Sequence, residues 1–165
     1  MIKATTNSVF TLLVDNEFGV LTRITAMIRR AGWNIRSLAV AETKIPEISR
    51  LTICLECRHH TLSYVLGRLG TLKCVREITV FSDETQVARE FAILQLKSPK
   101  SAIEVLCKRF SISVLENDGD KYFISVTAEP GELDELIAEL GGNLVDIART
   151  GAVALRRAAN QEVQP

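Results

Sequence analysis

One order of predicted elements occurs twice along the chain, and this repeat constrains the fold more than any single segment does. Apolar and β-branched runs predict strands, and apolar residues spaced three and four apart predict helices. In the first half these are a strand over 8–15, a helix over 19–32, strands over 34–43 and 49–57, a helix over 60–70 and a strand over 72–82. In the second half they are a strand over 88–98, a helix over 99–110, strands over 112–117 and 121–129, a helix over 130–141 and a strand over 145–155. Each half therefore has the order βαββαβ.

A βαββαβ unit closes into a four-stranded antiparallel sheet with both helices on one face, which is the ferredoxin-like arrangement. The 165 residues are therefore predicted to form an α+β protein of two consecutive ferredoxin-like units. We place the first unit at 1–82, a linker at 83–87, the second unit at 88–157 and a disordered tail at 158–165. The first strand is apolar on both faces, so we expect a homodimer in which both faces are covered.

The charge balance excludes several classes of partner. Lysine and arginine number 20, aspartate and glutamate also number 20, and no long run of one sign occurs. This composition favours neither nucleic acid nor an anionic membrane as a partner. The apolar runs are too short to span a bilayer, and residues 1–7 lack the apolar core of a secretory signal. We therefore expect a cytoplasmic location.

Neither a metal site nor a catalytic site is predicted. Cys54 and Cys57 form a CxxC followed by His59, but they lie in a strand-like run without a second ligand pair at matching spacing. Cys57 and Cys107 are interpreted as small core residues. The sequence contains no GxSxG, HExxH or P-loop motif, so we expect no catalytic residues and no metal.

The segment 15–43 carries the most specific functional signal. A strand passes into a helix there through Asn16 and Gly19. The N–H groups at a helix start carry partial positive charge and attract a small anion. Gly19 lacks a Cβ and lets a ligand approach the main chain closely. This junction suits the carboxylate of an amino acid better than it suits catalysis.

The runs N-E-x-x-G-V-L-x-R, R-x-G-x-N-I-x-S-L-x-V and I-S-R-L-T-I occur in that order within residues 15–53. In this order and spacing the chain resembles the small regulatory subunits of acetolactate synthase (acetohydroxyacid synthase), whose first half is an ACT domain. The resemblance continues through AREFAILQLKS and VDIARTGAVAL and covers nearly the whole chain. It implies an N-terminal ACT domain and a C-terminal ACT-like domain.

The resemblance also implies a function. Such a subunit has no chemistry of its own, activates a large catalytic subunit and carries the feedback site for valine. Thiamine diphosphate, Mg and FAD are then expected on the catalytic subunit only, and no cofactor on this chain. The effector lies between two ACT domains, which here places Asn16, Gly19, Val20 and Leu21 on one side and Asn34 and Ile35 on the other.

Some alternatives stay open at this point. A free-standing ACT sensor that regulates a different enzyme or a transcription factor fits the same residues, although no basic recognition helix is visible. The residues also do not fix which branched-chain amino acid is preferred, because one methylene changes binding by only about 1–3 kcal/mol. Phe18 and Trp33 fit an interface and a core edge equally well.

Overall fold

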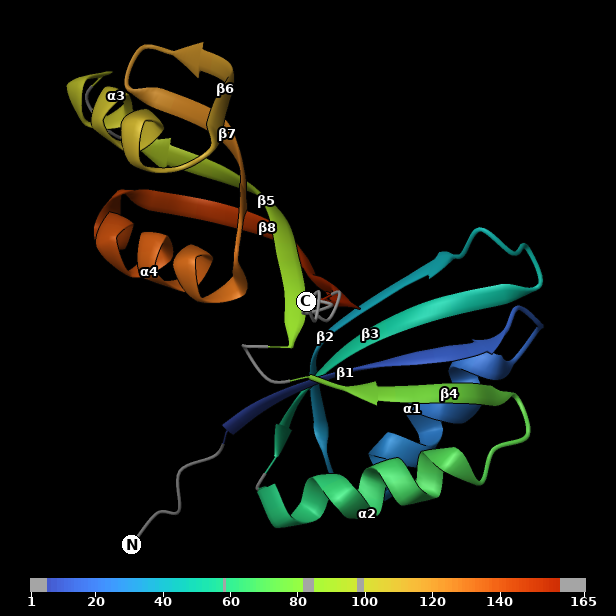
Figure 1. The fold of residues 1–165 in the computed structure, drawn as a ribbon. Helices are drawn as coiled ribbons and strands as arrows, with labels where there is room; N and C mark the ends of the chain where they lie inside the picture. The colour runs from blue at the N-terminus through green and yellow to red at the C-terminus, as the bar shows by residue number, and fades with distance from the viewer. Residues whose placement is uncertain (1–5, 58, 82–84, 98–99, 158–165) are drawn as a thin grey trace, which may run out of the picture. The chain divides into compact units, whose positions relative to one another are not determined.

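The computed structural model of the chain describes residues 6–57, 59–81, 85–97 and 100–157. Its contacts divide the chain into two compact units, residues 1–87 with 154–165, and residues 88–153. The structure contains two four-stranded sheets, each accompanied by two α-helices (Figure 1). The predicted α+β fold of two ferredoxin-like units is confirmed. The tail predicted at 158–165 lies outside the described residues.

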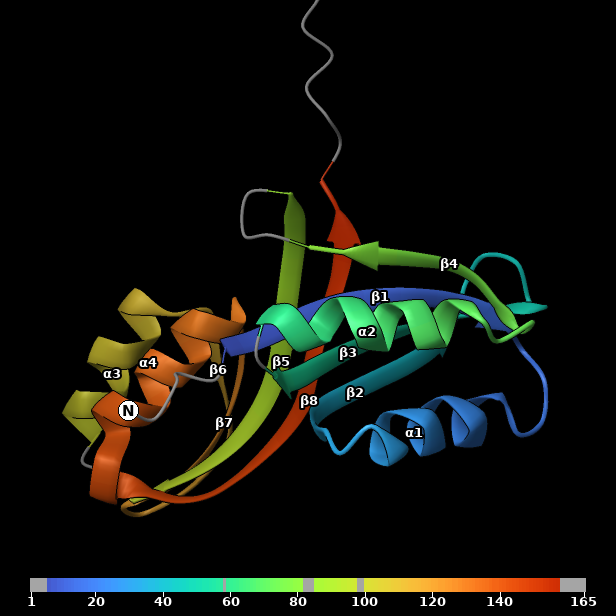
Figure 2. The ribbon, with the colours of Figure 1, turned by 90° about the horizontal axis from the view of Figure 1, so that it is seen from below.

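The first sheet has the strand order β2-β3-β1-β4, and its neighbouring strands are antiparallel. Both helices of this unit cover the same face of the sheet (Figures 1 and 2). The strands are β1 (Thr6–Asp15), β2 (Asn34–Glu42), β3 (Ile48–Cys57) and β4 (Val75–Val80), and the helices are α1 (Val20–Arg30) and α2 (His59–Gly70). Strand β4 begins later than the predicted position 72, because Leu72 belongs to a turn whose carbonyl accepts a hydrogen bond from the Val75 N–H at 2.9 Å.

The core of this unit follows from the alternation of side chains along β1. Phe10, Leu12 and Val14 are buried, whereas Val9 and Leu13 on the opposite face are half-buried. From α1, Val20, Ile24 and Ile28 join the buried cluster, as their helical spacing predicts. The helical spacing of apolar residues at 20, 21, 24, 27 and 28 predicts the same buried face for Leu21, which is instead exposed.

Gly32 ends α1 through a Schellman motif. Its φ of 79° is in the left-handed region that glycine favours. The Gly32 N–H donates to the Arg29 carbonyl at 2.9 Å, and the Trp33 N–H donates to the Ile28 carbonyl at 3.4 Å. The motif turns the chain from α1 into β2 and holds the backbone of Trp33 beside the last turn of the helix.

The second sheet has the strand order β6-β7-β5-β8. Its strands are β5 (Gln86–Lys97), β6 (Ile112–Asp118), β7 (Lys121–Ala128) and β8 (Leu144–Arg156), and its helices are α3 (Lys100–Arg109) and α4 (Pro130–Leu140). Apolar residues of both helices form one buried cluster with inward residues of β5 and β7, namely Leu94, Leu96, Ile103, Leu106, Ile124, Val126, Leu133, Leu136 and Leu140. Pro130 occupies the first turn of α4, as predicted, because its missing N–H is not needed there.

A charged network lies within the second unit. Glu90 on β5 is only 4% exposed, and its carboxylate accepts two hydrogen bonds from Arg149 on β8, at 2.7 and 2.8 Å. Arg149 also donates to Asp134 on α4 at 2.7 Å. These hydrogen bonds raise the pKa of the Arg149 guanidinium above its ordinary value. The network therefore stays charged and ties α4 to two strands.

The exposure of the cysteines corrects one prediction. Cys107 is exposed on α3, so its assignment to the core is wrong, and Cys74 is the buried cysteine. The side chain of Cys57 lies outside the described residues.

Among the helices that the structure describes, none is long and apolar enough to cross a membrane.

The Glu90 network predicts a specific loss of stability. Arg149→Gln leaves the buried Glu90 carboxylate without its guanidinium partner, and an uncompensated buried charge costs about 3 kcal/mol in the free energy of unfolding. Lys97→Gln on the same strand is the control, because the Lys97–Asp120 pair is 3.6 Å apart and exposed, and such pairs contribute about 0–1 kcal/mol. Urea unfolding followed by circular dichroism measures both, and equal losses would contradict the assignment.

Candidate functional site

The loop between β1 and α1 positions the first group of predicted site residues. Gly19 is the residue before α1, with φ of 80° and ψ of −3°. This left-handed conformation is open to glycine at little cost. A Cβ at Gly19 would meet nothing within 4 Å, so the space beside the main chain here is empty within the described chain. Gly19 is therefore required by the backbone conformation and leaves its surroundings open.

The start of α1 offers uncapped amide groups. The first helical hydrogen bond runs from the Arg23 N–H to the Gly19 carbonyl at 3.0 Å, and the Val20 N–H donates to the Glu17 carbonyl at 3.3 Å. No side chain caps this end of the helix. The N–H groups of Leu21 and Thr22 have no acceptor within the helix, because a first turn provides none. They are the donors best placed for an anion, whereas the Val20 N–H is used by the turn.

Asn16 fastens this loop to the hairpin between β2 and β3. Its backbone N–H donates to the Glu47 carbonyl at 2.8 Å. Its side-chain Nδ2 donates to the Pro46 carbonyl at 2.9 Å and to Glu42 Oε1 at 3.1 Å. Both side-chain bonds use the amide nitrogen, so the Oδ1 atom keeps its capacity to accept a hydrogen bond.

Two apolar side chains beside Gly19 are exposed. Phe18 has a relative exposure of 103%, and Leu21 of 42%. Of the two interpretations left open for Phe18, a core edge is excluded within the described chain. This end of α1 therefore presents an exposed aromatic ring beside uncapped amides.

The second group of predicted site residues lies at the other end of α1. Asn34 and Ile35 begin β2 directly after the Schellman turn. They line a hollow of about 430 Å³ together with residues along one face of α1, namely Thr22, Thr25, Ala26 and Arg29, and with Trp33. The sequence analysis did not assign these α1 residues to a site. Their spacing of three and four along one helix face is the signal that would have found them.

The two groups of site residues do not meet within one chain. Helix α1 has 11 residues, and at 1.5 Å per residue it separates its two ends by about 16 Å. Val20 is buried in the core at one end, and Asn34 is exposed at the other. Strand β2, which carries Asn34 and Ile35, is an edge strand of its sheet. One molecule therefore places the two halves of the predicted site, the loop at Gly19 and the pair of Asn34 and Ile35, apart, although the hollow beside Asn34 extends along α1 as far as Thr22.

The chemistry available at both halves is that of binding. Backbone amides, neutral side-chain amides and apolar side chains predominate among the described site residues. Among the residues that the structure describes, no group of three or more His, Cys, Asp and Glu side chains is arranged to hold a metal ion.

Two protein-family models match the chain, one in each half of the sequence. Residues 10–77 match the family model described as the AHAS small subunit-like ACT domain, and residues 89–158 match the model described as the small subunit of acetolactate synthase. The chain belongs to the acetolactate synthase small-subunit family. The resemblance stated from the motifs is thereby confirmed.

Individual relatives of this small subunit agree. The acetolactate synthase small subunit of Aquifex aeolicus is 34% identical over 154 residues, which cover 90% of this chain and 80% of that protein. The probable acetolactate synthase small subunit of Archaeoglobus fulgidus is 32% identical, with 88% of this chain and 94% of that protein covered. The crystal structure of the small subunit from Thermotoga maritima superposes with a TM-score of 0.80 at 27% identity, covering 92% of this chain and 98% of that one.

Replacement of glycine by alanine should have opposite effects on stability at Gly19 and at Gly67, because of these two only Gly19 has a left-handed conformation. Gly19→Ala forces a Cβ into a positive-φ backbone and should lower the free energy of unfolding by about 1 kcal/mol. Gly67→Ala lies inside α2, where a Cβ also meets nothing within 4 Å and φ is not positive. It should raise stability by up to about 1 kcal/mol. Thermal denaturation of both variants checks the sign, and a stabilising Gly19→Ala would show that the loop does not need glycine.

Proposed function

We propose that this chain is the non-catalytic, cytoplasmic regulatory subunit that activates the acetolactate synthase catalytic subunit and makes it sensitive to feedback inhibition by valine. Its membership of the small-subunit family supports this function. The effector site is supported by the uncapped amides at the start of α1 and by the hollow that Asn34 and Ile35 line near the other end of this helix in the ACT domain, which are the two half-sites of this proposal. In this proposal thiamine diphosphate, Mg and FAD belong to the catalytic partner.

A zwitterionic amino acid suits these half-sites. Its carboxylate would accept hydrogen bonds from the N–H groups at the start of α1, where the helix dipole adds attraction. Its ammonium group would donate to the Oδ1 atom of Asn16 or to the side-chain amide of Asn34. Leu21 and Ile35, exposed and half-buried respectively, would line the slot for a branched side chain.

A homodimer would join the half-sites. Because β2 is an edge strand, two copies can pair their β2 strands antiparallel about a twofold axis. The two α1 helices then run antiparallel beside each other, so the start of one helix lies near the end of the other. Asn16, Gly19, Val20 and Leu21 of one protomer would face Asn34 and Ile35 of its partner, giving two equivalent sites.

Regulation then follows from the position of the sites. An effector held between two protomers changes the free energy of their relative placement only if it binds the two arrangements unequally. Valine would favour the arrangement in which the catalytic subunit is less active. The coupling is a property of the interface and requires no chemistry on this chain.

A reconstitution experiment tests the regulatory function. Added to the purified catalytic subunit, the chain should raise the rate of acetolactate formation from pyruvate, and valine should reduce that rate. Gly19→Asp should remove the valine effect while activation persists, because it places a negative charge against the effector carboxylate. Gly119→Asp, which also has a positive φ but lies in the second unit, is the matched control. A chain that binds an amino acid without changing the rate would instead be a free-standing sensor.

A mixed dimer tests whether each site spans two protomers. Gly19→Asp and Asn34→His should each abolish or strongly weaken valine binding in a homodimer, measured by calorimetry. A heterodimer purified through two different tags, with one variant on each protomer, should recover one of its two sites. One site then carries both substitutions and the other carries neither. Absence of recovery would show that the half-sites do not combine across the dimer.

A further inference from the structure

The charged side chains on the two helices of the first unit, α1 and α2, are all basic. Helices α1 and α2 contain Arg23, Arg29, Arg30 and Arg68, all exposed, and no aspartate or glutamate. The whole chain, by contrast, has equal numbers of basic and acidic residues, 20 of each. A concentration of one sign on one layer of a neutral chain attracts a partner of the opposite sign.

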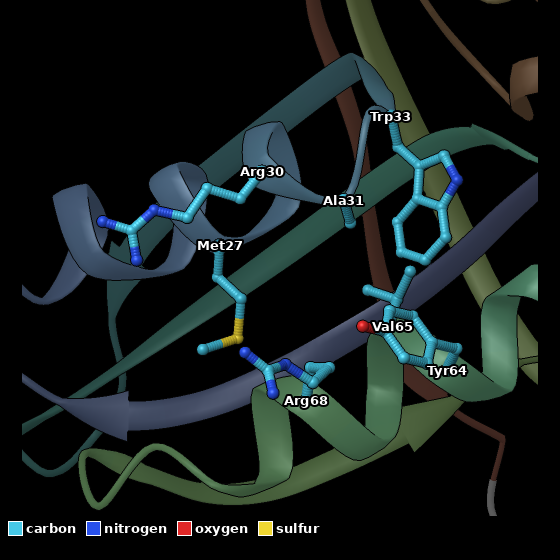
Figure 3. A pocket seen from close by; sticks show the side chains of 7 residues that line it. All are labelled: Met27, Arg30, Ala31, Trp33, Tyr64, Val65 and Arg68. Carbon is cyan, nitrogen blue, oxygen red and sulfur yellow. The ribbon is translucent and has the colours of Figure 1, made fainter.

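A cavity lies within this layer, between the end of α1 and the middle of α2. Its volume is about 110 Å³, and it is lined by Met27, Arg30, Ala31 and Trp33 on one side and by Tyr64, Val65 and Arg68 on the other. Figure 3 shows the Met27 side chain reaching from α1 towards α2, where Arg68 lies, with Trp33 and Tyr64 close together beyond it. None of the seven residues belongs to the predicted effector site.

The aromatic part of the cavity consists of two rings in contact, and one of them is exposed. The rings of Trp33 and Tyr64 pack edge to face, with their centroids 6.2 Å apart and their planes at 82°. Trp33 is fixed by the Schellman turn, whereas Tyr64 is 61% exposed. Tryptophan, tyrosine and arginine are the residues that carry most binding energy at protein interfaces, and methionine is enriched there.

The two arginines at the cavity are free to bind. Within the part of the chain that the structure describes, neither Arg30 nor Arg68 has a carboxylate partner. A guanidinium presents several donors in a planar fork that matches a carboxylate. An incoming segment with an acidic side chain would satisfy these donors at the same place where the cavity accepts an apolar group.

We propose that this cavity is the anchor point for the catalytic subunit, receiving one apolar side chain from an acidic segment of that subunit. This inference rests on the proposed regulatory function. The size of the cavity supports a side chain as the occupant, because sites for free small molecules typically measure about 300–1,000 Å³. The acidic character of the segment follows from the arginines that surround the cavity.

Trp33 connects this anchor point to the effector site. It lines both the cavity between α1 and α2 and the hollow that contains Asn34 and Ile35. A shift of the chain at the start of β2 would therefore move a wall of the anchor cavity. The inferred docking place thus lies one residue along the chain from the second half-site.

Binding of the purified catalytic subunit to the full chain, followed by surface plasmon resonance, tests the inference. Arg68→Glu and Tyr64→Ala should each weaken binding by about ten-fold or more. Arg23→Glu is the matched control on the same layer, since it reverses the same charge without lining the cavity, and it should weaken binding clearly less than Arg68→Glu does, because it reduces only the long-range attraction. Added salt should weaken binding of the unmodified chain more than binding of Arg68→Glu.

Three further measurements separate the possible failures. Valine calorimetry and circular dichroism of the variants should match those of the unmodified chain, which shows that the fold and the effector site are intact. If both variants bind as tightly as the unmodified chain, the docking place is wrong while the regulatory function stands. If the unmodified chain neither binds nor activates the catalytic subunit, the regulatory function and the inference both fail.

Discussion

Helix α1 has a fixed length between two glycines with positive φ, and the arrangement of both proposed binding surfaces depends on it. Gly19 starts the helix with its amides uncapped, and Gly32 ends it in a Schellman motif. Buried Ile24 and Ile28 hold the helix on the sheet between these two points. The two groups of predicted effector residues are therefore held about one helix length apart, at about 1.5 Å per residue, and in the proposed function a second copy of the chain completes the site.

In the proposed function, this separation is the reason why the regulatory domain would act as a dimer. A site contained within one protomer would report only on ligand binding. A site divided between two protomers changes the free energy of their association, and this change is available to a third protein. The edge position of β2 supplies the free hydrogen-bonding groups that such an association uses.

The two units distribute charge differently. In the first unit the helices carry arginines and neither aspartate nor glutamate, and we propose that this layer binds acidic groups of a partner. In the second unit the Arg149 guanidinium is paired with the carboxylates of Glu90 and Asp134, and these ion pairs stabilise the fold. The arginines of α1 and α2 thus differ from Arg149 in that no ion pair with a carboxylate of the described chain is seen at the cavity, whereas Arg149 has two such pairs.

Much of the fold was predictable from local pattern. The alternation of Phe10, Leu12 and Val14 and the spacing of Val20, Ile24 and Ile28 determine their elements directly, because burial follows strand and helix periodicity. The motif around Gly19 also identified the family. The start of β4 and the exposure of Leu21 and Cys107 were predicted wrongly. They depend on turn hydrogen bonds and on which neighbours cover a side chain.

The repeat and the two ferredoxin-like units could be derived from the sequence alone, since they follow from periodicity along the chain, and the motif around Gly19 led to a prediction of the effector residues. The packing of the chain was needed to show that these predicted residues lie toward opposite ends of α1. It also decided that Tyr64 and Arg68 meet Met27 and Trp33 around one cavity. These residues are distant in sequence, and their proximity results from the packing of two helices on one face of a sheet.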